Sequence, residues 1–212
     1  MTRSLTELPD QAPDDIPAYP MPRAQRCPLD PPPALSALRS DGPMTRVRLW
    51  DGSTPWLVTR YAEQRALLSD PRVSADTTRE GYPYQSESLR DRYLSIVHSG
   101  RRRVAVGDIE VAGQVIRAGE GIVMPNEIAN RDAGMFPDPE GLDVHRDARG
   151  HLAFGFGVHQ CLGQPLARVE LQVVYGTLYR RVPSLALAAD PAQIPFKHDG
   201  VVYGVYELPV TW

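Results

Sequence analysis

With 212 residues, the chain can bury one sizeable core or at most two small ones. A net charge of −3 and a pI near 6.0 argue against a general nucleic-acid-binding surface. The apolar runs are far too short to span a membrane, and no apolar secretory signal opens the chain. Two cysteines, Cys27 and Cys161, do not make a disulfide framework. We therefore expect a cytoplasmic protein with neither nucleic-acid nor membrane partners.

Residues 1–32 are predicted to form an irregular arm. Prolines prevent any regular element there, at Pro13, Pro17, Pro20, Pro22 and Pro28. A short helix is then predicted over residues 34–38, because Pro31 to Pro33 precede it and Asp41-Gly42-Pro43 stops it.

A β-hairpin and a second helix are predicted next. Residues 45–50 alternate polar and apolar side chains, Asp51-Gly52 is a turn signal, and residues 56–59 form the return strand. A helix over residues 61–68 follows, and Asp70-Pro71 ends it.

The rest of the chain is predicted to mix helices with short strands. A helix is expected over residues 89–97 and short strands with glycine turns over 104–123. A helical turn is expected at 126–132, and loop-forming residues dominate 136–146. Short alternating runs within residues 201–208 predict a terminal hairpin. The run Arg101-Arg-Arg103 is interpreted as a solvated turn.

The most informative stretch is Phe154-Gly-Phe-Gly-Val-His-Gln-Cys-Leu-Gly163. It predicts a glycine-rich loop and a helix that opens at Cys161 and continues to Arg180-Arg181. A cysteine at a helix N-terminus favours the thiolate form. Glycines without a Cβ, Gly155, Gly157 and Gly163, would let a large flat group approach the backbone, and Phe154 and Phe156 would supply apolar walls.

Two other interpretations of Cys161 stay open from the residues alone. It could be an inert cysteine in a glycine turn, or a nucleophile with His159 as its base. A phosphate-binding loop is excluded, because the stretch lacks both the third glycine of a dinucleotide fingerprint and a Walker lysine.

The spacing of Phe154, Gly157, Cys161 and Gly163 resembles the haem-binding loop of cytochromes P450. The order of elements in residues 1–75 also resembles the start of a soluble bacterial P450. The resemblance implies haem as cofactor, with the Cys161 thiolate as iron ligand that favours O–O cleavage. It also implies oxidation of a small apolar substrate with O₂, and a ferredoxin-type electron donor.

The resemblance further implies which side chains meet the haem propionates. Arg103 matches the family arginine by its register with Asp108-Ile-Glu110, and His151 and His159 resemble family positions that hydrogen-bond the same carboxylates. For each of the three, a plain surface cation is the alternative. No residue is assigned a catalytic role.

The middle of a P450 is not found. The segment Ala/Gly-Gly-x-Asp/Glu-Thr of the distal oxygen-handling helix is missing, and the join falls near Arg90 to Arg92. The family's Glu-x-x-Arg pair is then either Glu87 with Arg90, or Arg92 with Leu89 in place of the glutamate.

The expected fold is therefore an incomplete P450-like α+β fold, mainly helical, with a small antiparallel sheet and a C-terminal hairpin. Residues 33–90 form its N-terminal helix and hairpin portion, and residues 91–212 form the haem-loop portion of the same domain. The expected function is a P450-type monooxygenase. The alternatives are an internally deleted, non-catalytic remnant that binds haem weakly or not at all, and a homodimer sharing one haem.

Overall fold

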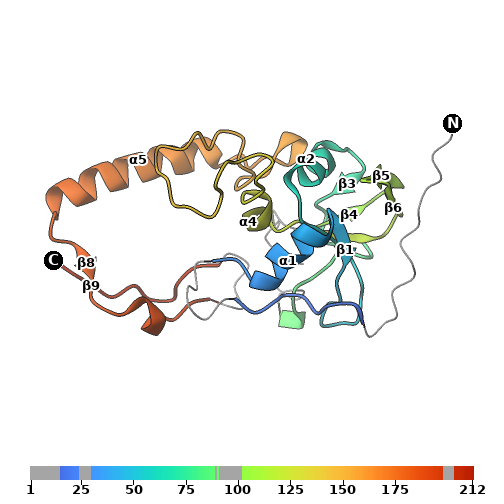
Figure 1. Cartoon of the computed structure of the whole chain (residues 1–212), viewed down its shortest axis with the longest axis horizontal. Coiled ribbons are helices and arrows are strands. Elements are labelled where there is room, and N and C mark those ends of the chain that lie inside the picture. The colour runs from blue at the N-terminus through green and yellow to red at the C-terminus, as the bar shows by residue number, and fades with distance from the viewer. Residues whose placement is uncertain (1–14, 24–29, 89, 91–101, 198–202) are drawn as a thin grey trace. The chain divides into compact units, whose positions relative to one another are not determined.

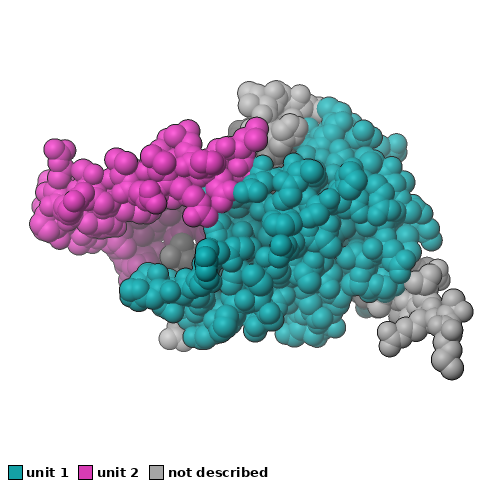
Figure 2. All heavy atoms as spheres, turned by 90° about the horizontal axis from the view of Figure 1, so that it is seen from above, with its two compact units in different colours: residues 1–22, 31–160 teal, residues 23–30, 161–212 magenta. Residues whose placement is uncertain are grey.

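The structure, a computed structural model, describes residues 15–23, 30–88, 90, 102–197 and 203–212. The chain divides into two compact units (Figure 2). Unit 1 contains residues 1–22 and 31–160, and unit 2 contains residues 23–30 and 161–212. Among the helices that these ranges contain, none has the length and apolar character needed to cross a lipid bilayer.

Unit 1 contains a five-stranded sheet of order β1-β2-β7-β4-β3. Its strands are β1 (Met44–Arg46), β2 (Trp56–Val58), β7 (Gly121–Val123), β4 (Arg102–Ala105) and β3 (Val73–Ser74). The predicted α+β class is confirmed, but the sheet is not purely antiparallel as expected, because β2 and β7 pair in parallel. Strands from both predicted portions of the chain, residues 33–90 and 91–212, meet in this sheet.

The predicted hairpin at the start of the sheet is confirmed. Strands β1 and β2 pair antiparallel, with Thr45 opposite Leu57. At its tip the Leu49 N–H donates to the Ser53 carbonyl at 2.9 Å, and Gly52 has a φ of 81°. That left-handed backbone conformation is open to glycine at little cost, which explains the Asp51-Gly52 signal.

A second hairpin, β5 (Ile109–Val111) with β6 (Gln114–Ile116), lies in the segment where short strands were predicted (Figure 1). Its turn residues Ala112 and Gly113 both have positive φ, 51° and 73°. Two consecutive residues with positive φ match the right-handed twist of the flanking strands.

The predicted helices of unit 1 are present. They are α1 (Pro33–Asp41), α2 (Tyr61–Ser69) and the short α4 (Asn126–Ala129). Helix α2 ends before Pro71, which cannot donate a backbone hydrogen bond. The helix predicted over residues 89–97 lies outside the described residues except for Arg90, as do Leu89 and Arg92.

Two apolar clusters fill unit 1. The first joins β2, β7 and α2 to Phe136 and Leu152, and its partly buried neighbours include Phe156. The second surrounds Leu35 of α1 and Leu57 of β2, and it includes Tyr19 and Met21. The described part of the N-terminal arm is therefore tied into the core.

Strand β4 corrects one prediction directly. Arg102 and Arg103, interpreted from sequence as part of a solvated turn, are both 3% exposed. Neighbouring residues of a strand point to opposite faces of the sheet, so two consecutive arginines extend to different sides of β4.

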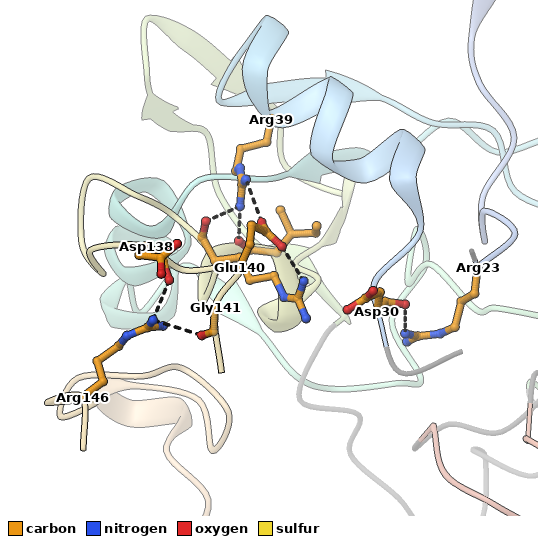
Figure 3. Close-up of polar contacts among 9 residues, drawn as sticks. Arg23, Asp30, Arg39, Asp138, Glu140, Gly141 and Arg146 are labelled. Atoms are coloured by element: carbon orange, nitrogen blue, oxygen red, sulfur yellow. Dashed lines mark hydrogen bonds and ion pairs between the residues drawn. The ribbon is translucent and has the colours of Figure 1, made fainter. Parts of the chain in front are cut away.

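Unit 2 contains helix α5 (Gln164–Arg181) and two short strands, β8 (Ala186–Leu187) and β9 (Val210–Thr211), which pair antiparallel. An isolated antiparallel bridge joins Phe196 to Val205. The C-terminal hairpin is thus confirmed, and its pairing extends over more of the chain than the predicted runs within residues 201–208, of which residues 201 and 202 lie outside the described residues. The Arg23 side chain donates to the Asp30 carbonyl at 2.8 Å (Figure 3) and lies over the Tyr203 ring.

Candidate functional site: the cysteine loop

The loop that precedes Cys161 is held to α4 by two asparagine side chains. Asn126 Nδ2 donates to the Leu152 carbonyl at 2.7 Å, and the Leu152 N–H donates to Asn130 Oδ1 at 2.7 Å. Leu152 itself is fully buried. Satisfied hydrogen bonds in a buried setting fix the backbone strongly, so the start of the loop has a defined position.

Two glycines allow the loop to turn tightly. Gly155 and Gly157 have φ of 75° and 59°. A Cβ on Gly155 would lie 2.5 Å from the His159 carbonyl oxygen, and one on Gly157 would lie 3.0 Å from the Leu68 carbonyl oxygen of α2. These glycines therefore close the loop on itself and on α2. The sequence-based view, that they leave open space for a flat group, is not the role seen within unit 1.

The two phenylalanines have different surroundings. Phe156 packs against the first apolar cluster, and the Arg65 guanidinium of α2 lies 4.4 Å above its ring centre. Phe154 is half-buried, with its ring 6.0 Å from that of His151. Phe156 therefore anchors the loop, whereas Phe154 remains partly available at the surface of unit 1.

Of the three predicted propionate partners, the structure brings two together. His159 Nε2 lies 2.8 Å from the Val73 carbonyl, so this nitrogen carries the hydrogen and donates it. Burial, together with the nearby charge of Arg103, lowers the pKa of His159. Burial also lowers the pKa of Arg103, whose Nη1 donates to the Arg102 carbonyl at 2.7 Å.

The third predicted partner, His151, has a different local role. Its Nδ1 accepts a hydrogen bond of 3.2 Å from the Ala153 N–H. The ring therefore braces the backbone just before the glycine loop.

Cys161 and Gly163 belong to unit 2. Cys161 is a free, exposed cysteine. It does not open the helix as predicted, because α5 begins at Gln164, with Pro165 in its first turn and Gly163 as N-cap. The Gln164 N–H donates to the Cys161 carbonyl at 3.2 Å, so the cysteine lies in the turn before the helix.

The donor set can be tested against haem residue by residue. Arg103 and His159 suit an anion, because a carboxylate beside them would offset the repulsion between a guanidinium and a protonated imidazole. The Cys161 thiol is the soft sulfur ligand that haem iron accepts. Within the described ranges, no group of three or more His, Cys, Asp or Glu side chains gathers as a metal site. In its chemistry, each of these donors suits the part of haem that it would meet.

A polar network holds the segment between α4 and the loop (Figure 3). Arg39 of α1 donates through Nη1 to the carbonyls of Ile128 and Arg131, at 3.0 and 2.5 Å. Glu140 accepts from Arg131 at 2.5 Å and faces Arg39 at 3.8 Å. Arg146 Nη2 donates to the carbonyls of Asp138 and Gly141, which closes this segment on itself.

The sequence analysis did not identify the residues whose side chains hold the cysteine loop in place. Asn126 and Asn130 recur four residues apart on one face of a helical turn, which was the available signal. Arg65 gave none, because an arginine in an amphipathic helix is ordinarily solvated. The network around Arg39 joins residues about ninety positions apart, beyond any local pattern.

Comparison with known proteins gives a consistent result. A family model described as cytochrome P450 matches residues 86–188. Cytochrome P450 GfsF of Streptomyces halstedii is 30% identical over 411 aligned residues, which span 99% of both chains. The crystal structure of GfsF has a TM-score of 0.82 and covers 92% of this chain.

Relatives matched over a shorter stretch are more similar. Cytochrome P450-SU2 and vitamin D3 dihydroxylase, both of Streptomyces griseolus, are 57% and 56% identical over 121 residues. These matches span 57% of this chain but only 30% of either relative. The alignment with GfsF extends over 411 positions, whereas this chain has 212 residues, so a long stretch of GfsF has no counterpart here.

Proposed function

Since the chain belongs to the cytochrome P450 family, we propose that it is a haem-thiolate protein of the monooxygenase class, with Cys161 as the iron ligand. The observation that carries this proposal is the spacing of Phe154, Gly157, Cys161 and Gly163, in a loop whose first part is locked against α2 and α4. Haem, when bound, supplies the chemistry that activates dioxygen.

The chain's own residues have distinct parts in this proposal. Arg103 and His159 attract the propionates, and His151 steadies the backbone before the loop. Gly155 and Gly157 set the course of the loop toward Cys161, Phe154 offers an apolar contact, and Gly163 ends the turn before α5. An exposed Cys161 is accessible to a ligand that approaches from outside unit 2.

The substrate class and the electron donor follow from the family. We propose a small apolar substrate and a ferredoxin-type donor, since the relatives include a vitamin D3 dihydroxylase and other bacterial P450s. We also propose that the stretch of GfsF without a counterpart corresponds to the absent middle and falls near Arg90 to Arg92. No described residue is assigned to the handling of dioxygen.

The test is a haem titration followed by reduction under carbon monoxide and an absorbance spectrum. We expect saturable binding and the Soret position of a thiolate-ligated ferrous–CO haem. Cys161→Ala should abolish that band, while Cys27→Ala, a change in the chain's other cysteine, should retain it. Arg103→Leu should weaken haem binding without moving the band.

A spectrum unchanged by Cys161→Ala would contradict the assignment of the iron ligand. Absence of saturable binding would favour the alternative, a non-catalytic remnant. Should haem bind with one equivalent per two chains, as sedimentation with absorbance detection would show, the shared-haem dimer would replace the monomeric site.

A further inference from the structure

Gln64 is a polar side chain in a fully buried position of unit 1. It lies on the buried face of helix α2 and is 0% exposed. Its Nε2 donates to the Val58 carbonyl of β2 at 2.8 Å and to the Pro125 carbonyl, at the N-cap of α4, at 3.2 Å. A single amide group therefore joins the sheet, α2 and the start of α4.

The orientation of this amide is fixed by its two acceptors. If its oxygen and nitrogen were exchanged, the oxygen would face two carbonyl oxygens. In the orientation observed, Gln64 Oε1 is buried and receives no hydrogen bond from the described residues. A buried acceptor without a donor is unfavourable, so packing alone would favour an apolar side chain here. The two hydrogen bonds from Nε2 are therefore what a glutamine contributes at this position.

Helix α4, whose start Gln64 holds, carries the two asparagines that hold the cysteine loop. Asn126 follows Pro125 directly and donates to the Leu152 carbonyl, and Asn130 accepts from the Leu152 N–H. Since α4 has only four residues, its own hydrogen bonds do not make it stable in isolation. The position of the two asparagines therefore depends on the contacts of α4 with its neighbours, and Gln64 provides one of these at its first turn.

The cysteine loop is attached to unit 1 at its other end as well. His159, two positions before Cys161, contacts the Val73 carbonyl of β3 through Nε2 at 2.8 Å. Between Leu152 and His159 the chain is closely packed, as the two tight glycine positions show. In a closely packed segment, a displacement at one end is transmitted along the chain. The position of Leu152 therefore affects the residues that lead to Cys161.

We propose that Gln64 is a positioning residue for the cysteine loop and acts on it through α4. Its amide fixes Pro125 at the start of α4, Asn126 and Asn130 then fix Leu152, and Leu152 sets the course of the loop. All of these contacts lie within unit 1. The consequence for Cys161 as iron ligand rests on the proposed function, whereas the effect on the loop does not.

The first measurement is hydrogen exchange of the Leu152 amide in the full chain without haem. Gln64→Met keeps a side chain of similar length that cannot donate a hydrogen bond. We expect the Leu152 amide to exchange at least tenfold faster in Gln64→Met, after correction for any change in global unfolding. Leu35→Ala is the matched control, because it removes a fully buried side chain from the second apolar cluster. It should accelerate this exchange only in proportion to global unfolding.

The second measurement is the ferrous–CO spectrum of the chain loaded with haem. Gln64→Met should lower the fraction of thiolate-ligated haem at least twofold, whereas Leu35→Ala should retain it. Gln64→Glu is the conservative variant, because a buried carboxyl stays protonated and can donate one hydrogen bond. It should give values between those of the parent chain and Gln64→Met in both measurements, and it replaces Gln64→Met if that variant does not fold.

Equal exchange of the Leu152 amide in the parent chain and in Gln64→Met would overturn the proposal. An acceleration no larger than global unfolding explains, as in Leu35→Ala, would also overturn it and would leave Gln64 a core residue only. Faster exchange with an unchanged ferrous–CO spectrum would refute the step from the loop to the iron ligand. If the parent chain forms no thiolate-ligated haem, the proposed function fails, and the exchange of Leu152 still decides whether Gln64 positions the loop.

Discussion

Helices α2 and α5 differ in what surrounds them, although both carry leucines and tyrosines. Helix α2 buries Tyr61, Gln64, Leu67 and Leu68 against the sheet and the cysteine loop. Helix α5 is twice as long and buries nothing. The apolar side chains of α2 are therefore buried by other residues of unit 1. The described residues of unit 2 contain no comparable apolar surface that would bury the apolar side chains of α5.

The largest expected effect is a difference in unfolding free energy between alanine substitutions of two leucines. Leu68→Ala in α2 removes a fully buried side chain and should cost about 2–5 kcal/mol of unfolding free energy. Leu171→Ala in α5 should cost less than about 0.5 kcal/mol, because that side chain is already 46% exposed. Urea denaturation of both variants measures the two costs. Equal losses of unfolding free energy would show that Leu171 is buried in solution, and α2 and α5 would then not differ in burial.

A second pair compares glycines on either side of the unit boundary. Gly155→Ala places a Cβ 2.5 Å from the His159 carbonyl oxygen at a positive φ, so it should cost about 1–3 kcal/mol. Gly163→Ala has φ of −80°, and its Cβ would approach nothing closer than 3.7 Å. It should be nearly neutral. Thermal unfolding followed by circular dichroism distinguishes them, and a larger loss for Gly163→Ala would refute the geometry of the loop.

The third prediction concerns Glu120 of unit 1. Burial by itself would raise the pKa of this carboxyl, but hydrogen bonds from Arg46, the Arg117 N–H and Trp56 Nε1 hold its pKa below the usual value. Its stabilising effect is then complete above the unfolded pKa of about 4.3 and disappears as the pH falls through the lower folded pKa. Glu120→Gln should cost about 1–2 kcal/mol near neutral pH.

The measurement is thermal unfolding of the parent chain and of Glu120→Gln, from neutral pH to below the folded pKa of Glu120. The two unfolding free energies should converge as the pH falls. A constant difference across that range would mean that ionisation of the carboxyl adds nothing to its hydrogen bonds.

The smallest effect is expected at the surface network of Figure 3. Glu140→Gln removes ion pairs whose acidic side chain is 57% exposed, so the loss should stay below about 1 kcal/mol and should shrink with added salt. Arg39→Met should cost more, because it leaves the Ile128 and Arg131 carbonyls without this donor. Urea titrations at two ionic strengths give both values, and the reverse order would contradict the contacts seen.

Local signals predicted much of unit 1 correctly. Asp51-Gly52 and Ala112-Gly113 marked two hairpin turns, in which Gly52, Ala112 and Gly113 have positive φ, and Pro71 marked the end of α2. The parallel pairing of β2 with β7 could not be predicted, because the two strands are more than sixty residues apart and nothing local specifies their register.

The candidate site was predicted in its residue types more than in its geometry. The spacing around Cys161 identified the loop, but Pro165, which is favourable in the first turn of a helix, was the better signal for where α5 begins. The burial of Arg102 and Arg103 was not visible from a run of three arginines, since composition alone favours solvent there. Their environment is set by strands β3 and β7 on either side of β4.

The antiparallel pairing of β3 with β4 has a consequence for chain length. Ser74 faces Val104, so the chain leaves the sheet at one strand and returns at its immediate neighbour. The proposed join near Arg90 to Arg92 lies within this connection. The free-energy cost of the entropy lost on closing a flexible connection grows only with the logarithm of its length, by about 0.6 kcal/mol for each doubling. A connection between two adjacent strands can therefore be a short loop or a long inserted segment. The sheet can keep its strand pairing when the residues between β3 and β4 are gained or lost.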